Sequence, residues 1–173
     1  MDYGLIVDLE TTGLDAETDQ IIEIGLVEFS VDHDRPPGIS RCYGALEDPG
    51  IELSPEITKV TGLTQAQLRG QKIDWALVRQ WCERASVIVA HNARFDRGFL
   101  MKRPELAGLK MHWACSLEHI DWRSKDFRSQ NLNYLAADHG FVNPFPHRAL
   151  FDCATTFRLM APHIDELMER SYL

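Results

Sequence analysis

The sequence has 173 residues, of which 45% are hydrophobic and 25% are charged, and this is the composition of an ordinary globular protein. It excludes intrinsic disorder, collagen, coiled coils and low-complexity chains. The length predicts a single domain over residues 1–173. The formal charge of −8 argues against a nucleic-acid partner, because domains that bind nucleic acid are usually basic.

The charge is unevenly distributed along the chain. Residues 94–128 carry 8 basic and 5 acidic side chains, whereas residues 1–93 carry 7 basic and 16 acidic ones. We therefore expect part of the acid to belong to a site rather than to the general surface. No apolar run approaches the ~20 residues of a membrane helix, so no membrane contact is expected. The start lacks the basic region of a signal peptide and the four Cys form no CxxC pair, which predicts a cytoplasmic protein with reduced thiols.

Three strands are expected in the first part of the chain. Residues 4–10 form an apolar run that ends in two acids, and residues 21–31 are apolar and rich in β-branched side chains. The Pro- and Gly-rich residues 34–38 predict a turn that leads into a third strand over residues 39–46. The short connections favour a three-stranded meander.

The rest of the chain is predicted to be mainly helical, with one short buried strand. The expected elements are a helix starting at Pro55, a helical turn over 64–68, a helix from Asp74 to about Ala85, a strand over 86–90, and helices over 93–103, over 131–140 and from Arg148 onward. This order predicts one α/β or α+β domain with a mixed sheet.

Four carboxylates and one histidine stand out as candidates for chemistry. Asp8 and Glu10 alternate on one strand and so share one face of it. Asp96 lies in the first turn of a helix, Asp152 lies beside the apolar face of the last helix, and His147 precedes it by five residues. Taken singly, each has a simpler reading as a polar strand end, a helix-dipole partner or a solvated loop residue. Together they predict a site for hard divalent cations, which prefer oxygen ligands and can clamp a phosphodiester.

Three segments resemble a known family. Residues 6–14 are similar to the first motif of the DnaQ-like DEDDh 3′–5′ exonucleases, continued by residues 22–25. Residues 90–96 resemble the second motif, H-N-x-x-F-D, and residues 147–152 resemble the third, H-x-A-x-x-D. Residues 57–64 also resemble the family's segment before its middle helix. The resemblance spans residues 4–160 and its motifs are in the family's order.

This resemblance implies the ribonuclease H-like α/β fold, a five-stranded mixed sheet flanked by helices with the second strand antiparallel. Residues 110–115 are the best candidate for the fifth strand. Family members often carry an Asp-Thr pair where this chain has Cys115-Ser116, and we attach no functional weight to that departure.

The resemblance also implies roles for the five candidate residues. Asp8, Glu10 and Asp152 would hold the metal that activates the nucleophile, and Asp8 would bridge to a second metal near Asp96. His147 would be the general base that takes a proton from the attacking water. The expected cofactors are two divalent metal ions, Mg²⁺ or Mn²⁺.

Further positions resemble the family's substrate contacts. The 3′-terminal nucleotide would lie against seven residues: Thr11, Thr12, Gly13, Leu14, His91, Asn92 and Phe95. Leu14 would wedge against the terminal base, although Leu14 and Phe95 are equally readable as core residues. Glu23 matches the first motif but has no metal role in the family, so it is interpreted as a structural acid.

The predicted function is therefore hydrolysis of single-stranded or frayed 3′ ends of DNA or RNA to nucleoside 5′-monophosphates. One alternative is a proofreading subunit bound to a DNA polymerase, since the chain resembles the exonuclease domain of the epsilon subunit of bacterial DNA polymerase III. The end of the sequence at Leu173, with no Gly/Pro/Gln-rich tail, favours a free-standing enzyme. Another alternative is an RNA-trimming exoribonuclease similar to RNase T.

The RNase T alternative would use basic residues outside the active site, and the segment 94–128 is the candidate for that role. The same charges are equally readable as ordinary solvated ones. A metal-free interaction module is the non-enzymatic alternative, and the complete acid set argues against it. The sequence leaves open both the choice between DNA and RNA and the oligomeric state.

Overall fold

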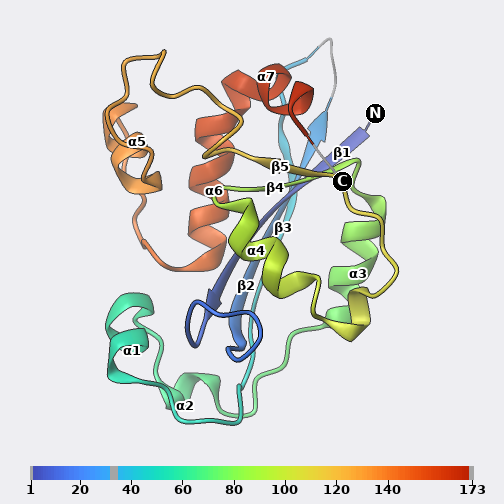
Figure 1. Ribbon diagram of the computed structural model, residues 1–173, viewed down its shortest axis with the longest axis vertical. Coiled ribbons are helices and arrows are strands. Elements are labelled where there is room, and N and C mark those ends of the chain that lie inside the picture. Colours follow the sequence, from blue (N-terminus) through green and yellow to red (C-terminus); the bar gives the residue numbers. More distant parts are fainter. Residues whose placement is uncertain (1, 32–34, 172–173) are drawn as a thin grey trace.

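A five-stranded mixed sheet lies at the centre of the computed structural model, which describes residues 2–31 and 35–171 (Figure 1). The strands are β1 (Asp2–Thr11), β2 (Ile21–Val31), β3 (Ile39–Leu46), β4 (Val87–Ala90) and β5 (Trp113–Cys115). Their order across the sheet is β3-β2-β1-β4-β5. β2 pairs antiparallel with β1 and β3, whereas β4 pairs parallel with β1 and β5. The predicted five-stranded mixed sheet with an antiparallel second strand is confirmed.

β1 is the central strand, and its residues pack on both faces of the sheet. Leu5, Val7 and Leu9 belong to one hydrophobic cluster, and Ile6 belongs to the cluster on the opposite face. This alternation follows from the two-residue repeat of an extended chain. The apolar run therefore fixes the middle of the sheet and delivers Asp8 and Glu10 to its carboxyl end.

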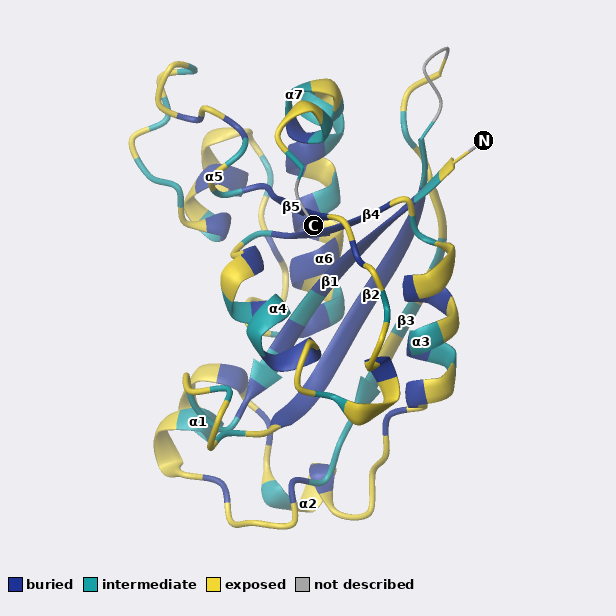
Figure 2. Ribbon diagram, turned by 45° about the vertical axis from the view of Figure 1, so that its right-hand side comes forward, coloured by how far each residue is buried: buried dark blue, intermediate teal, exposed yellow. Residues whose placement is uncertain are grey.

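Helices cover both faces of the sheet (Figure 2). One face packs against α3 (Trp75–Arg84) and α4 (Ala93–Leu100), through Trp81, Val78 and Leu100 among others. The other face packs against α6 (Ala149–Met160), with α5 (Leu132–Asp138) and α7 (Ile164–Glu169) beside it. Burial of these apolar faces is the main force that stabilises the three layers.

Two short helices lie beyond the end of the sheet, α1 (Pro55–Thr61) and α2 (Gln65–Leu68) (Figure 1). Ser54 caps α1 by accepting from the Ile57 N–H, and Thr64 and Gln67 form a capping box on α2. Leu63 and Leu68 bury this corner against β2 and β3. Both helix starts agree with the predicted ones.

The structure corrects three details of the predicted elements. α4 ends at Leu100 rather than near residue 103, because the chain passes into the 3-10 turn η1 (Pro104–Leu106). The fifth strand is β5, shorter than the predicted 110–115. α7 and the 3-10 turn η2 (Ala161–His163) were not expected, since α7 has only six residues and one buried side chain, Leu167. The predicted turn begins at residue 34, and residues 32–34 lie outside those described.

The four cysteines are all free, and Cys82, Cys115 and Cys153 are buried while Cys42 is exposed. This agrees with the predicted reduced thiols. None of the helices in the described part of the chain is long and apolar enough to cross a membrane.

Candidate active site

The carboxyl end of β1 lines a cleft of about 640 Å³. Its walls come from β1 and the loop after it, from α1, and from the N-terminal ends of α4 and α5, with the loop before α6 completing it. Twelve residues were predicted for the site and eleven of them line this cleft: Asp8, Glu10, Thr11, Gly13, Leu14, His91, Asn92, Phe95, Asp96, His147 and Asp152. The twelfth, Thr12, points elsewhere.

The two strand acids share the cleft with the other carboxylates. Burial raises the pKa of Asp8 well above its usual value, and the charges of Asp96, Asp152 and Glu10 raise it further. Burial also raises the pKa of Glu10 to about 8, with Asp152 as the next contributor. Without cations, the carboxylates at this end of the sheet therefore tend to bind protons. When ionised, the same carboxylates carry enough negative charge to bind cations instead.

Asp96 occupies the first turn of α4 and is 3% exposed. Its Oδ1 atom is buried and has no hydrogen-bond partner among the described residues. Burial raises the pKa of Asp96, against the opposing effect of the backbone N–H groups of Leu9 and of Asp96 itself. A buried carboxylate oxygen without a donor is costly unless a cation binds it. Asp96 therefore fits the metal-binding role.

Asp152 lies in the first turn of α6, close to His147 and Glu10. One ligand atom from each of Glu10, His147 and Asp152 lies within 4.8 Å of the others. Burial raises the pKa of Asp152 to about 6, while hydrogen bonds from Asn143 and the His147 backbone act in the opposite direction. The donor set of carboxylate oxygens with one imidazole suits a hard or borderline divalent cation.

The start of α6 is fastened to β2. The Arg148 guanidinium donates to the Glu23 carboxylate, with Nη2 at 3.0 Å and Nε at 3.1 Å from Oε1. The Ala149 N–H donates to the same carboxylate at 3.3 Å. A Cβ atom on Gly25 would lie 2.4 Å from the Ala149 backbone, so only glycine allows this close approach. Glu23 thus holds the helix that carries Asp152, in line with the structural role predicted for it.

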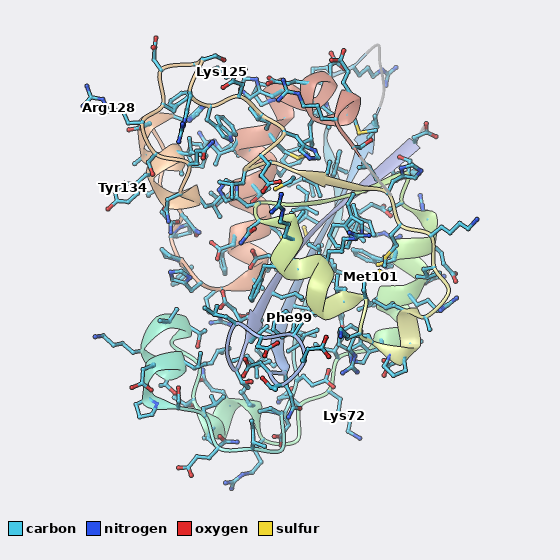
Figure 3. The ribbon with its side chains drawn as sticks, viewed as in Figure 1. Lys72, Phe99, Met101, Lys125, Arg128 and Tyr134 are labelled. Atoms are coloured by element: carbon cyan, nitrogen blue, oxygen red, sulfur yellow. The ribbon has the colours of Figure 1, made fainter. Side chains whose placement is uncertain are left out.

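Leu14 and Phe95 differ in their surroundings. Leu14 is 87% exposed at the cleft, so its alternative reading as a core residue is wrong. Phe95 lines the cleft and also packs on the core, with its ring 5.0 Å from that of Phe99. Figure 3 shows Phe99 close to the loop that follows β1. Phe95 therefore forms an apolar cleft wall supported from behind.

Thr12 does not reach the cleft. Its hydroxyl lies 3.2 Å from the Asp19 carboxylate, to which it donates, and it accepts from the Gln20 N–H at 3.0 Å. Asp19 also accepts from the Asp15 N–H at 2.9 Å, which closes the loop after β1 on itself. Thr12 thus shapes the loop that presents Gly13 and Leu14.

Two hydrogen-bond partners hold the His91 ring. One of them is Ser116, to which the sequence analysis attached no functional weight. Its Nδ1 lies 2.8 Å from the Ser116 hydroxyl, and its Nε2 lies 2.8 Å from the Gln130 carbonyl oxygen. Burial lowers the pKa of His91, so the neutral ring is favoured. The Ser116 side chain, at the position where the family often carries Asp-Thr, therefore orients a cleft residue.

Several cleft residues were not foreseen from the sequence. They are Leu9, Ile57, Val60, Thr61, Leu117, Gln130, Asn131, Leu132 and Asn133. Most come from α1 and α5, which contain no charged or metal-binding side chain in the cleft. The resemblance of residues 57–64 to the family was the one available signal for the α1 group.

Ion pairs partly neutralise the basic segment 94–128. Arg94 pairs with Glu118 at 3.3 Å, Arg103 with Glu105 at 3.0 Å, and Lys125 with Glu166 at 2.8 Å, while Lys102 pairs with Glu17. Arg128 projects outward beside α5, away from the body of the protein (Figure 3). These pairs favour the interpretation of the segment as ordinary surface charge.

The fold and the acidic cleft are those of a nuclease with the ribonuclease H-like architecture. The chain belongs to the exonuclease family RNase_T, which matches residues 5–160. It is 29% identical over 174 residues to "DNA polymerase III PolC-type" of Streptococcus suis, covering 98% of this chain and 12% of that protein. It is 33% identical over 157 residues to the protein of the same name from Listeria monocytogenes, covering 87% of this chain and 10% of that protein. The chain thus spans about a tenth of these relatives.

Solved structures agree on the fold. The nuclease domain of 3′hExo, a DEDDh family member bound to rAMP, has a TM-score of 0.74 at 20% identity, covering 99% of this chain and 96% of that chain. Exonuclease X in complex with 5′ overhanging duplex DNA has a TM-score of 0.66 at 24% identity, covering 96% of this chain and 92% of that chain. The expected family and fold are therefore confirmed.

Proposed function

We propose that this chain is a metal-dependent 3′–5′ exonuclease that releases nucleoside 5′-monophosphates from nucleic acid. The observation that carries the proposal is the convergence of Asp8, Glu10, Asp96 and Asp152 with His147 in one cleft, from β1, α4, α6 and the loop before it. These four carboxylates would hold two divalent cations, Mg²⁺ or Mn²⁺. When bound, the cations would polarise the scissile phosphate and make the attacking water more acidic.

His147 is the general base of the proposed reaction. Its side chain is exposed at the cleft, and imidazole is the side chain that most often accepts protons at neutral pH. One ring nitrogen takes the proton of the water that attacks the phosphorus. The backbone of His147 is tied to Asp152 at 3.0 Å, which keeps the base beside the acids.

The walls of the cleft set the substrate. Leu14, Ile57 and Val60 offer apolar contact to a terminal base. Of the polar lining residues, Thr11 follows Glu10 on β1, and Asn92 precedes the helix that carries Asp96. A cleft of about 640 Å³ holds one or two nucleotides rather than a duplex. The substrate is therefore a single-stranded or frayed 3′ end of DNA or RNA.

A second candidate role is proofreading in association with a DNA polymerase. The observation that favours it is the identity of the curated relatives, which are PolC-type DNA polymerases III. A polymerase subunit that co-purifies with this protein and raises its activity on mismatched 3′ ends would support this role. An RNase T-like role would instead show as preference for RNA.

The direct test is digestion of matched single-stranded DNA and RNA, labelled at either end, with Mg²⁺, Mn²⁺ or EDTA. We expect 3′-labelled substrate to release labelled mononucleotide at once and 5′-labelled substrate to shorten as a ladder. A substrate with a blocked 3′ end is the control and should persist. Release of mononucleotide from the 5′ end, or equal activity in EDTA, would overturn the proposal.

A further inference from the structure

Asn143 is a buried amide outside the motifs described above, and it contacts one of the acids. It lies between α5 and α6 and is 8% exposed. Its Nδ2 donates to Asp152 Oδ1, and its Oδ1 accepts from the Phe145 N–H at 3.1 Å. The amide therefore hydrogen-bonds through both of its polar atoms, through the nitrogen to Asp152 and through the oxygen to the loop that leads to His147.

The same carboxylate holds that loop at its other end. The His147 N–H donates to Asp152 Oδ2 at 3.0 Å, so each Asp152 oxygen accepts one hydrogen bond from residues 143–147. Each carboxylate oxygen has a second lone pair, which leaves Asp152 able to bind a cation as well. The Asp152 carboxylate therefore connects the two ends of the loop formed by residues 143–147.

The backbone conformation at His147 explains why these two hydrogen bonds to Asp152 are needed. Its φ is +60°, in the left-handed region that side chains other than glycine rarely adopt. Pro144 and Pro146 lack N–H groups and fix their own φ angles, so the loop has few other donors to hold it. The contacts of Asn143 and Asp152 keep a strained residue in place.

We infer that Asn143 is a positioning residue, which orients the Asp152 carboxylate and the His147 backbone so that the imidazole faces the cleft. This inference rests on the proposed function, because it gives the loop a purpose in that reaction. A neutral amide suits the position, since it adds a donor to Asp152 without adding a fifth carboxylate to the cleft. Asn143 itself does not line the cleft, so it would act through Asp152 and His147.

The test uses Asn143→Ala and Asn143→Asp, with Phe145→Ala as the matched control. Asn143→Ala removes both side-chain bonds, whereas Asn143→Asp keeps the volume and the acceptor but loses the donor to Asp152. Phe145→Ala removes an exposed ring from the same loop and leaves its backbone N–H in place. All three proteins are first checked for folding by circular dichroism.

We expect Asn143→Ala to lower kcat about 10- to 100-fold and to weaken Mn²⁺ binding, measured by calorimetry on the protein alone, by a similar factor. KM for a single-stranded oligonucleotide should change less than about threefold. Asn143→Asp should lower kcat at least as much, because a fifth carboxylate then faces Asp152. Phe145→Ala should keep kcat within about twofold.

A second readout is independent of activity. Hydrogen exchange of the His147 amide, followed by NMR in metal-free protein, should be about tenfold faster or more in both Asn143 variants. Wild-type kcat and unchanged His147 protection in folded Asn143→Asp would overturn the inference, even if Asn143→Ala failed to fold. If the wild type hydrolyses no nucleic acid, the proposed function fails, while the exchange rates still decide whether Asn143 holds His147.

Discussion

The Glu23 carboxylate on β2 and the Arg148 guanidinium at the start of α6 are joined across 125 positions of sequence, with Nη2 3.0 Å from Oε1. Glu23 is 6% exposed, so the pair is largely withdrawn from water on the acid side. The ion pair fixes the start of α6 against the sheet. His147 immediately precedes it and Asp152 lies one turn further on, so both depend on this anchor.

Removal of the anchor should therefore lower both stability and activity. Glu23→Ala leaves Arg148 without its partner and should cost about 2 kcal/mol of unfolding free energy, with a kcat loss of about tenfold or more. Glu28→Ala is the matched control, since Glu28 is a buried acid on the same strand that pairs with Arg41 at 2.7 Å. It should cost similar stability in urea unfolding but leave kcat within about twofold. Equal kcat losses in the two variants would contradict a specific role for the anchor.

Gly25 should resist any side chain. A Cβ there would lie 2.4 Å from the Ala149 backbone, so Gly25→Ala should push α6 outward and cost about 1–3 kcal/mol with loss of activity. Gly44 is its register partner on β3, and a Cβ there would lie 3.4 Å from a flexible Leu150 methyl group. Gly44→Ala is thus the control and should cost much less. Thermal melts of both variants measure the difference, and equal shifts would refute the close-approach argument.

Asp8→Asn should separate chemistry from stability. The substitution removes the carboxylate proposed to bind both metals and should lower kcat by about 10³-fold or more. It also removes a buried carboxyl group whose ionisation burial and its acidic neighbours disfavour, so the metal-free protein should melt about 2–5 °C higher at pH 8. Activity is measured with Mg²⁺ and melting is measured in EDTA. A variant with near wild-type turnover would refute the metal assignment.

The acidic cleft should make stability depend on pH in a defined direction. The pKa of Glu10 is raised to about 8 and that of Asp152 to about 6, so the folded state binds more protons than the unfolded state between about pH 4 and 8. The contribution of these groups to stability is therefore greatest at low pH and falls as pH rises through this window. Melting temperatures in EDTA should show this decrease, and Glu10→Gln should flatten it. An unchanged slope in Glu10→Gln would contradict the assignment.

Cations should reverse that trend. Mg²⁺ or Mn²⁺ competes with protons for the same carboxylates, so the gain in melting temperature on adding Mn²⁺ should be larger at pH 8 than at pH 5.5. Asp152→Asn should reduce this gain at pH 8. A gain that is independent of pH, or equal in the variant, would place the cation elsewhere.

His147→Ala tests the base. Loss of the imidazole should lower kcat about 10²- to 10⁴-fold, with a smaller effect on KM, because a general base stabilises the transition state of proton transfer rather than the bound substrate. His119→Ala is a suitable control, since His119 lies outside the cleft. Wild-type turnover in His147→Ala across pH 6–9 would remove the general-base role.

The sequence predicted most of the fold because its strong signals are local. Residues 21–31 and 39–46 became β2 and β3 with the same bounds. The helices α1, α3 and α5 start within one residue of the predicted positions, and Ser54, Asp74 and Asn131 cap them. β5 was identified through the family resemblance, since three residues give no clear repeat. α7 was missed because it is also short, and one buried residue in six does not reveal a helical face.

The acids of the site were predictable because each lies at a position that its own element defines. The supporting contacts were not, since Glu23–Arg148 and Ser116–His91 join residues 125 and 25 positions apart. No spacing in the sequence encodes such a bond. Thr12 is a case in which the motif misled the prediction. Its position in the first motif placed it in the cleft, but its hydroxyl donates to Asp19 instead.

The position of α6 also bears on how the protein is made. Its first turn supplies Asp152, which lies 144 positions after Asp8 in the chain. A ribosome therefore completes β1 to β5 and α1 to α5 before the last acid and the histidine emerge. A nascent chain that has not yet reached α6 lacks His147 and Asp152, so under the proposed function it cannot hydrolyse nucleic acid until these residues have left the ribosome.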